Sequence, residues 1–178
     1  FEAGAGVGGT WYWNRYPGAR FDSESYSYGY SFSQELLKDW EWKEHFSAQP
    51  ENERYLNHVA DKFELRKNIQ FESRVLSATY RSHSLDWKIE TENGDTATAR
   101  FLLNATGILS APFIPEILRA DEYRGQSWHT SLWPKEPVDL STKNVAVIGT
   151  GATAVQLITE IAKKIGHLTV FQRTPNYC

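Results

Sequence analysis

Gly149 and Gly151 are the residues of this 178-residue chain whose type and spacing predict chemistry most directly. They follow the apolar run 144–148, which is typical of a buried parallel strand. Glycines at the end of such a strand allow a tight turn in which the backbone can approach a pyrophosphate, and Ala154 is small enough for a following helix to lie against the strand. The unpaired N–H groups at the start of that helix can bind phosphate oxygens. Residues 149–154 are therefore predicted to bind a dinucleotide.

Arg173 indicates which dinucleotide is bound. A helix is expected over residues 152–165 and a second strand over residues 168–171, and Arg173 comes just after that strand. In dinucleotide folds an acidic residue about twenty positions after the glycines accepts the ribose hydroxyl of NAD, whereas a nearby arginine accommodates the 2′-phosphate of NADP. Arg173 lies 24 positions after Gly149, and no Asp or Glu is present at this strand end. The predicted coenzyme is NADP, and the alternative is an ordinary glycine-rich turn.

The first residues could hold a second nucleotide. Glu2 ends what looks like a strand, at the position where a dinucleotide fold places its ribose-binding acid, although it could equally be a surface acid. Four glycines follow within residues 4–9, and residues 10–18 are rich in aromatic side chains. This combination suits a loop that approaches a planar ring system, or a rigid loop packed into a core. Asp22 comes shortly afterwards, and the tyrosines of residues 26–30 alternate as in an extended segment.

The remaining periodicity predicts helices followed by strands. Ser33 can cap a helix over residues 34–45, and Pro50 can begin a second helix whose apolar stripe runs to Phe63. His45 and His58, on these two helices, have no second ligand at metal spacing, so we assign them structural roles and expect no metal site. The β-type runs are residues 69–71, 75–80, 85–91 and 97–103, with an Asn93-Gly94 hairpin turn between the last two.

Composition limits the possible partners and compartment. Lys and Arg number 19 and Asp and Glu 22, so there is no basic surplus to suggest nucleic acid. No run approaches the roughly eighteen apolar residues of a membrane span. The single cysteine, Cys178, cannot form an internal disulfide, which is consistent with a reducing compartment such as the cytoplasm.

The ends of the chain suggest an internal fragment. It begins Phe1-Glu2, contains no Met, and stops just after the second strand of a βαβ unit. A doubly wound sheet cannot end there. We therefore expect a piece of a larger protein that is inactive and poorly stable alone.

Three motifs together resemble the Baeyer–Villiger monooxygenases, over essentially the whole chain. The first is Tyr123-x-Gly125-x-x-x-His129-x-x-x-Trp133-Pro134, which is similar to the fingerprint of that family. The second is the segment 8–20 followed by Asp22, and the third is residues 170–175. Tyr123 replaces the usual Phe, and Phe21 lies beside Asp22 where some members have a small or polar residue. The resemblance is to the phenylacetone and cyclohexanone monooxygenase type.

This resemblance implies a fold and an activity. The fold class is α/β with two dinucleotide-binding, Rossmann-like domains, both incomplete here, and with a helical insertion and a β-meander in the first. The implied domains are a partial FAD-binding domain at residues 1–107, a linker with the fingerprint motif at 108–143, and the start of an NADP-binding domain at 144–178. The implied reaction uses FAD, NADPH and O₂ to convert a ketone into an ester or lactone.

The resemblance also implies roles for individual residues. Asp22 would be catalytic as the charge partner of an arginine that lies beyond Cys178, and it would also contact the flavin. His129 and Trp133, with Gly125, belong to a linker that couples the motion of the two domains, so their role would be structural or gating. The FAD contacts would be Glu2, Thr10, Trp11, Asn14, Phe21, Tyr28 and Val75. The NADP contacts would be Gly149, Thr150, Gly151, Ala152, Thr153, Ala154, Gln156, Arg173 and Thr174.

Two other interpretations are open at this point. A flavin N- or S-oxygenating enzyme, or a relative of the disulfide reductases, would share the two nucleotide folds, but a reductase needs a redox cysteine pair. A different class would be a regulatory module that senses NADP without turnover. The preferred ketone and the oligomeric state cannot be inferred from these residues.

Replacing Arg173 with Ala in the complete protein tests the NADP prediction. We expect the preference for NADPH over NADH to fall by about tenfold or more, because a hydrogen bond to a charged group contributes roughly 1.5–3 kcal/mol. Titration with both coenzymes measures the effect. Equal or tighter binding of NADH by the unaltered protein, with no change on substitution, would contradict the prediction.

Overall fold

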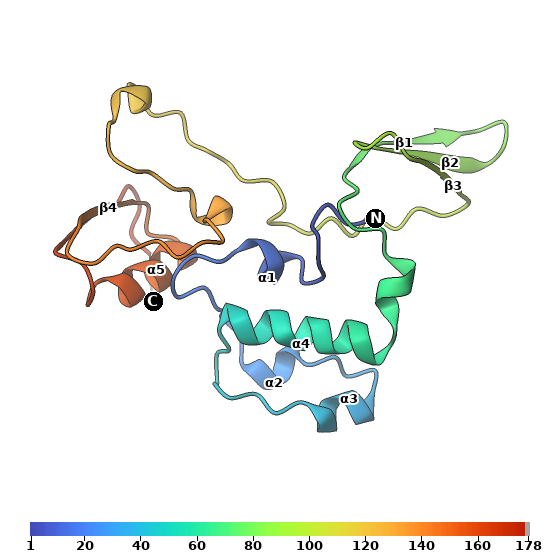
Figure 1. The fold of residues 1–178 in the computed structure, drawn as a ribbon, viewed down its shortest axis with the longest axis horizontal. Coiled ribbons are helices and arrows are strands. Elements are labelled where there is room, and N and C mark those ends of the chain that lie inside the picture. Colours follow the sequence, from blue (N-terminus) through green and yellow to red (C-terminus); the bar gives the residue numbers. More distant parts are fainter. Residues whose placement is uncertain (177–178) are drawn as a thin grey trace. The chain divides into compact units, whose positions relative to one another are not determined.

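The computed structural model describes residues 1–176, so the prediction made for Cys178 lies outside the described residues. The chain divides into two compact units. The first contains Phe1–Tyr12 and Glu53–Ala111, and the second contains Trp13–Asn52 and the chain from Pro112 onward. Figure 1 labels the elements of both units. The predicted domain boundaries at residues 107 and 143 stay a prediction.

Three antiparallel strands form the sheet of the first unit, in the order β1 (Val75–Arg81), β2 (Asp86–Thr91) and β3 (Thr96–Ala99). The predicted Asn93-Gly94 turn is confirmed, since Gly94 has a φ of +87° and its N–H donates to the Thr91 carbonyl at 3.0 Å. The predicted strand 97–103 is wrong beyond Ala99. Ala99 pairs with Trp87, the second residue of β2, so the residues after it have no strand to pair with.

The run 69–71 was predicted as a strand, and this is also wrong. Its backbone makes single hydrogen bonds with the first residues of the chain rather than a ladder: the Glu2 N–H donates to the Gln70 carbonyl at 2.9 Å. Glu72, just after the run, donates to the Gly4 carbonyl at 3.0 Å. These bonds fix the start of the chain within the first unit.

The helices are α1 (Thr10–Trp13), α2 (Ser25–Tyr28), α3 (Gln34–Asp39), α4 (Gln49–Lys62) and α5 (Ala152–Ile161), with short 3₁₀ turns η1 (Leu65–Asn68), η2 (Ala120–Glu122) and η3 (Thr130–Leu132). The helix predicted from Pro50 is confirmed as α4, which buries Tyr55, Val59 and Ala60, but Phe63, the predicted end of its apolar stripe, lies beyond the helix and is exposed. The Ser33 cap is confirmed as well, because its hydroxyl accepts from the Leu36 N–H at 3.2 Å.

The helix expected over residues 34–45 is too long, since α3 ends at Asp39. Trp40 is already extended, and the carbonyl groups of Glu44 and His45 accept hydrogen bonds from the Ser25 hydroxyl at 2.6 and 2.9 Å. A tertiary partner therefore takes carbonyl groups that a longer helix would use within its own backbone. Ser25 itself is buried.

The alternation of Tyr26, Tyr28 and Tyr30 predicted an extended segment, and this is wrong. Residues 25–28 form the helical turn α2. The ring of Tyr28 stacks on Phe21 with centroids 4.3 Å apart and an angle of 18° between the planes. The contact between these aromatic rings closes the segment on itself, which an extended chain could not do.

The strand, turn, helix and strand predicted near the end of the chain are confirmed in the second unit. Strands β4 (Asn144–Ile148) and β5 (His167–Phe171) pair in parallel, with Asn144 opposite His167 and Ile148 opposite Phe171. Helix α5 joins them and ends four residues before the predicted Ile165. The chain leaves the helix there because β5 has to begin beside the start of β4. The Gly166 N–H donates to the Lys143 carbonyl at 2.9 Å, just before His167 pairs with Asn144.

The core of the second unit combines residues far apart in sequence. Tyr16 and Ala19 come from the loop after α1, and Val147 comes from β4. They pack with Ala154, Leu157 and Ile161 on one face of α5. Trp133, Leu140, Val145, Ile158, Ile165 and Leu168 pack around this cluster with partial burial.

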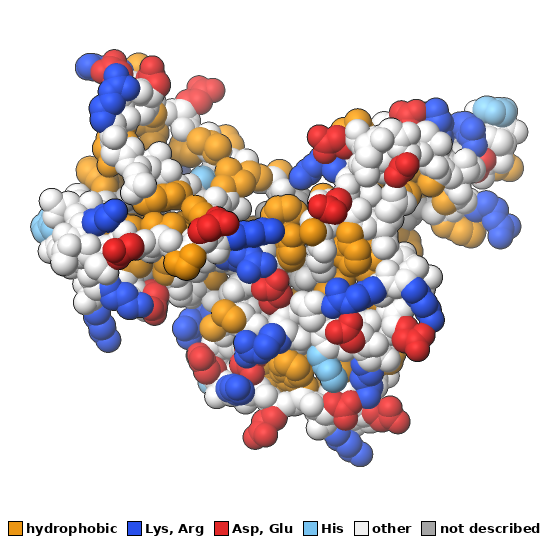
Figure 2. Space-filling view, in the orientation of Figure 1, with side chains coloured by type: hydrophobic (Ala, Val, Ile, Leu, Met, Phe, Trp, Pro, Cys, Tyr) orange, Lys and Arg blue, Asp and Glu red, His pale blue; other side chains and the backbone are white. Residues whose placement is uncertain are grey.

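The segment between β3 and η2 carries large apolar side chains in contact with solvent. Phe101, Leu103, Ile108, Phe113 and Leu118 are all exposed. Figure 2 shows hydrophobic side chains gathered on the visible surface rather than hidden beneath charged ones. No helix among residues 1–176 is long and apolar enough to cross a bilayer. No cluster of three His, Cys, Asp or Glu side chains in the same range could hold a metal ion.

Replacing Ile161 with Ala tests whether this core holds the second unit together. Ile161 is 3% exposed, and deletion of such a side chain destabilises a protein by about 2–5 kcal/mol. The midpoint of thermal unfolding of the complete protein should fall clearly. Thr159, exposed on the same helix, is the control, and Thr159→Ala should change the free energy of unfolding by no more than about 0.5 kcal/mol. Equal effects of both substitutions would contradict the assignment.

Candidate functional site

The turn between β4 and α5 leaves space for a ligand beside its backbone. Gly149 has a φ of +103°, a conformation that favours glycine. A Cβ atom added at Gly149 or Gly151 would have no heavy atom within 4 Å. Gly151 is the N-cap of α5, and no side chain caps the helix there. The first N–H groups of this ten-residue helix are therefore not satisfied by a capping side chain, as binding of a pyrophosphate requires.

Hydrogen bonds attach this turn to the end of β5. The Gly149 N–H donates to the Phe171 carbonyl at 2.8 Å, and the Thr150 hydroxyl donates to the Thr174 carbonyl at 3.1 Å. The Gln172 amide also donates to the Thr150 hydroxyl, at 3.3 Å. Arg173 thus lies at the same edge as the glycine turn. It is exposed and has no ion-pair partner among residues 1–176, so its charge is available to a phosphate.

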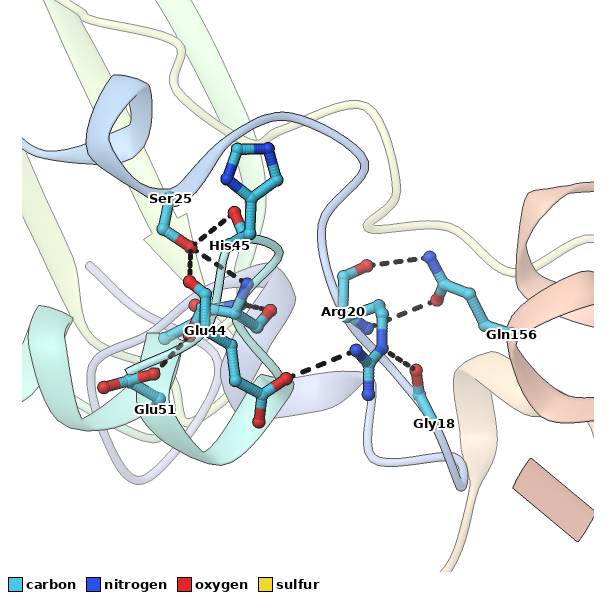
Figure 3. Close-up of polar contacts among 9 residues, drawn as sticks. Gly18, Arg20, Ser25, Glu44, His45, Glu51 and Gln156 are labelled. Atoms are coloured by element: carbon cyan, nitrogen blue, oxygen red, sulfur yellow. Dashed lines mark hydrogen bonds and ion pairs between the residues drawn. The ribbon is translucent and has the colours of Figure 1, made fainter. Parts of the chain in front are cut away.

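Gln156 lies one turn further along α5 and faces the loop that leads to Asp22. Its Oε1 accepts from the Tyr16 hydroxyl at 2.8 Å and from the Arg20 N–H at 3.2 Å. Its Nε2 donates to the Arg20 carbonyl at 2.9 Å and to Asp22 Oδ1 at 2.8 Å. Figure 3 shows the amide aligned with the Arg20 backbone. The structure therefore joins two predicted site residues, Gln156 and Asp22, that are 134 positions apart.

The loop can approach the helix because residue 18 is glycine. Gly18 has a φ of +82°, and a Cβ there would lie 2.5 Å from the Gln156 carbonyl oxygen. Tyr16, Gly18 and Arg20 were not predicted as site residues. The sequence contained a partial signal, since Pro17-Gly18 indicates a tight turn, but nothing in it identified α5 as the surface against which the turn packs.

Aromatic side chains surround the residue before Asp22. Phe21 is buried, stacks on Tyr28, and meets Trp42 edge-on at 5.9 Å. Trp42 was not predicted. The loop therefore holds Phe21, Asp22 and Tyr28 close together, as a shared role at a flavin would require. Asn14, half-buried just after α1, belongs to the same unit.

In the first unit, Glu2 is held by its own segment. Glu2 Oε1 accepts from the Gly4 N–H at 2.7 Å, and the Ser73 N–H donates to the Glu2 carbonyl at 2.9 Å. Glu2 Oε2 makes no hydrogen bond to residues 1–176, so one carboxylate oxygen is open to a ribose. Val75, at the start of β1, is 42% exposed. Thr10 and the buried Trp11 lie in α1.

The glycines of residues 4–9 have two different environments. Cβ atoms at Gly4 and Gly6 would lie 2.7 and 3.2 Å from the ring of Tyr12, so both positions must be small for this ring to pack. Gly9, in contrast, has a φ of +50° and no heavy atom within 4 Å of an added Cβ. The beginning of the run, at Gly4 and Gly6, is therefore packed against Tyr12. Its end, at Gly9, has open space beside the backbone. Tyr12 was not predicted as part of this arrangement.

The fingerprint residues lie in the second unit. The His129 Nδ1 accepts from the Ser131 N–H at 3.3 Å and so caps η3. Trp133 lies with its ring centroid 5.8 Å from that of Trp128 and packs against the core. The Tyr123 ring folds over Gly125, where a Cβ would lie 2.2 Å from the tyrosine oxygen. All of these contacts lie within the second unit.

A family model described as pyridine nucleotide-disulphide oxidoreductase matches residues 20–177. The chain belongs to this family. Membership of the pyridine nucleotide-disulphide oxidoreductase family confirms the predicted α/β class, and the parallel β4–β5 pair with α5 is its Rossmann-type part.

Named relatives confirm the resemblance noted in the sequence. An acetone monooxygenase (methyl acetate-forming) from Gordonia sp. is 48% identical over 177 residues, which cover 99% of this chain and 33% of the relative. A Baeyer–Villiger monooxygenase from Pseudooceanicola batsensis is 46% identical over 99% of this chain and 32% of the relative. A phenazine N-monooxygenase from Lysobacter antibioticus is 46% identical over 100% of this chain and 33% of the relative. This member of the oxidoreductase family thus spans about a third of the length of the curated relatives it matches.

Solved structures agree with these relatives. Cyclohexanone monooxygenase from Rhodococcus sp. Phi1 bound to NADP⁺ superposes with a TM-score of 0.94 at 44% identity, over 98% of this chain and 33% of the other. A protein named OTEMO, in complex with FAD and NADP, superposes with a TM-score of 0.93 at 49% identity, over 99% of this chain and 34% of the other. The fold of this oxidoreductase family member is therefore that of the cyclohexanone monooxygenase type.

Tyr16 gives a pH-dependent test of the contact between loop and helix. Burial raises the pKa of the Tyr16 hydroxyl above 10.0, the nearby Asp22 charge raises it further, and a hydrogen bond with the Thr153 side chain opposes these effects. The pKa of Tyr16 is higher in the folded state than in the unfolded state. Its contribution to the free energy of unfolding is therefore fully present below pH 10.0 and is lost as the pH rises through the folded-state pKa.

We expect Tyr16→Phe to flatten the loss of thermal stability of the complete protein between about pH 9 and pH 11, because phenylalanine has no proton to lose. Thermal unfolding at a series of pH values measures this effect. Tyr26→Phe, at an exposed tyrosine, is the control and should leave the profile unchanged. Identical profiles for the unaltered protein and Tyr16→Phe would contradict the assignment.

Proposed function

We propose that the complete protein is an FAD- and NADPH-dependent monooxygenase that inserts an oxygen atom from O₂ into a ketone and produces an ester or lactone. Whole-chain similarity to an acetone monooxygenase and to a Baeyer–Villiger monooxygenase supports this reaction. The observation that carries the proposal is the arrangement around α5. One helix offers its open N-terminal turn to a dinucleotide, lies beside the cationic tip of β5, and hydrogen-bonds to Asp22.

NADP is proposed to bind along the edge formed by the β4–α5 turn and the end of β5. The pyrophosphate would accept hydrogen bonds from the first N–H groups of α5, since neither Gly149 nor Gly151 carries a side chain that would obstruct it. The 2′-phosphate would pair with Arg173. The proposed contacts are Gly149, Thr150, Gly151, Ala152, Thr153, Ala154, Arg173 and Thr174. The Gln156 side chain makes its hydrogen bonds within the protein and is considered below.

Glu2 in the first unit and Asp22 in the second are each proposed to contact FAD. The free oxygen of the Glu2 carboxylate would accept a hydrogen bond from a ribose hydroxyl. Asp22 would serve as the charge partner of an arginine elsewhere in the complete protein. The other proposed contacts are Thr10, Trp11, Asn14, Phe21, Tyr28 and Val75. When bound, the two cofactors supply reducing equivalents and the activation of O₂.

The residues near Asp22 and in the fingerprint segment are proposed to position other parts of the site. The stacked Phe21 and Tyr28 rings are proposed to hold the loop that carries the exposed Asp22 in position. His129 and Trp133 are proposed to transmit motion between the domains. The support is that His129 caps η3 while Trp133, just after η3, packs on the core, so that the segment is attached to the second unit at both residues.

Oxygenation of nitrogen is the second candidate function. It is favoured by the similarity to a phenazine N-monooxygenase, which covers the full length of this chain. Reduction of a disulfide has no cysteine pair to support it in these 178 residues, since Cys178 is the only cysteine. Sensing of NADP without turnover is a third interpretation. Reduction of the flavin by NADPH would exclude it. A cytoplasmic location is proposed, consistent with a single cysteine.

The decisive experiment uses the complete protein with its flavin. We expect flavin absorbance after purification, bleaching of this absorbance when NADPH is added without O₂, and conversion of cyclohexanone to its lactone when O₂ is admitted. Stable absorbance in the presence of NADPH would contradict an oxidoreductase and favour the sensor. Oxygenation of a phenazine with no lactone formed would favour the second candidate.

A further inference from the structure

The hydrogen-bonding capacity of the Gln156 side chain is completely used inside the second unit. A primary amide has two N–H donors and an oxygen that accepts two hydrogen bonds. Here the oxygen accepts from the Tyr16 hydroxyl and the Arg20 N–H, and the nitrogen donates to the Arg20 carbonyl and to Asp22. The amide therefore has no group left for a coenzyme, unlike the residues of the glycine turn. This speaks against the predicted contact between Gln156 and NADP.

The orientation of this amide is determined by its partners. A backbone N–H can only donate and a backbone carbonyl can only accept, and Gln156 contacts both of these groups of Arg20. If oxygen and nitrogen were exchanged, donor would face donor and acceptor would face acceptor. The N–H group directed at Asp22 is therefore fixed by the Arg20 backbone and does not depend on a choice of side-chain flip.

Gln156 is the hydrogen-bond donor to the Asp22 carboxylate within residues 1–176. Asp22 is exposed, and its Oδ1 accepts a hydrogen bond from Gln156 at 2.8 Å. The nearest arginine in sequence, Arg20, directs its guanidinium elsewhere, to Glu44 at 3.3 Å and to the Gly18 carbonyl at 3.4 Å. Removal of the Gln156 amide would therefore leave the Asp22 side chain free to change its direction.

The other end of the connection is the coenzyme turn. Gln156 lies in the same helix as Ala152 and Thr153, whose backbone begins the first turn of α5. An α-helix moves as a rigid element over this distance, because each turn is hydrogen-bonded to the next. The close approach of Gly18 and the packing of Ala19 keep the loop in contact with the same helix.

From this geometry we propose that Gln156 is a positioning residue, which fixes Asp22 to the coenzyme-binding helix through the Arg20 backbone. When a dinucleotide phosphate orders the first turn of α5, the same helix orders the segment 16–22. The inference rests on the proposed function for the identity of the coenzyme. It adds that occupancy of the coenzyme site and the position of Asp22 are coupled through one side chain.

Hydrogen exchange of the backbone amides in the complete flavoprotein tests this proposal without any substrate. In the unaltered protein, addition of NADP⁺ should slow exchange in the peptide containing residues 16–22. In Gln156→Leu the Arg20 N–H loses its acceptor, so its exchange should accelerate on the order of tenfold, and NADP⁺ should no longer slow it. The affinity for NADP⁺, measured by titration, should change less than about threefold, since no contact with the coenzyme is lost.

A second variant separates the two halves of the amide. Gln156→Glu keeps the side-chain length and the acceptors for the Tyr16 hydroxyl and the Arg20 N–H, but it loses both donors and places a carboxylate against Asp22. Exchange at Arg20 should therefore remain slow, while the product formed per NADPH consumed should fall about tenfold. Thr159→Ala, one turn along the same helix, is the matched control and should behave like the unaltered protein.

The outcomes distinguish the alternatives. Unchanged exchange in both Gln156 variants would overturn the proposal, as would a loss of NADP⁺ affinity greater than about tenfold with exchange unaffected, which would mean that Gln156 binds the coenzyme. If Gln156→Leu does not fold, the Gln156→Glu result decides, because that variant keeps the acceptors for the Tyr16 hydroxyl and the Arg20 N–H; an unchanged yield of product per NADPH consumed would then overturn the proposal. Absence of ketone oxidation by the unaltered protein would refute the proposed function and leave the exchange result standing.

Discussion

The packing of the loop 16–20 against α5 is the interaction on which the rest of the second unit depends. Tyr16 and Ala19 bury apolar surface against Leu157 and Ile161, and the backbone of Gly18 comes close enough that any side chain there would collide with the helix. Burial of apolar area provides the stabilisation, and the absence of a side chain at residue 18 sets the distance. The hydrogen bonds of Gln156 form only because this contact brings the Arg20 backbone within reach.

Helix α5 consequently carries two parts of the proposed site. Its N-terminus carries the partial positive charge and unpaired N–H groups that suit a phosphate, and its second turn binds the loop that holds Asp22. Two charged side chains lie near different parts of this helix: Arg173 follows β5 beside the glycine turn, and Asp22 is hydrogen-bonded to Gln156 on the second turn.

Where a local sequence pattern gave a wrong prediction, a side-chain contact outside that pattern explains the observed structure. The sequence pattern of residues 34–45 is helical, but the Ser25 hydroxyl binds carbonyl groups near its end and the chain leaves the helix at Trp40. The alternating tyrosines suit a strand, but the stacking of Tyr28 on Phe21 bends the chain into a turn. In both cases a tertiary contact outweighed a local preference that is weak over so few residues.

The amino-acid sequence by itself determined the β4–α5–β5 unit, the glycine turn, the position of Arg173 and the hairpin at Asn93-Gly94. Each of these follows from spacing within about thirty residues, where strand and helix periodicity and turn chemistry act directly. The sequence motifs also indicated the similarity to the monooxygenases, which the named relatives confirm. Only the tertiary structure decided that Gln156 hydrogen-bonds to Asp22 and to the Arg20 backbone, and that the Tyr12 ring packs on Gly4 and Gly6. The reason is physical: a side chain's partners depend on which distant segment packs beside it, and no periodicity in the sequence records that choice.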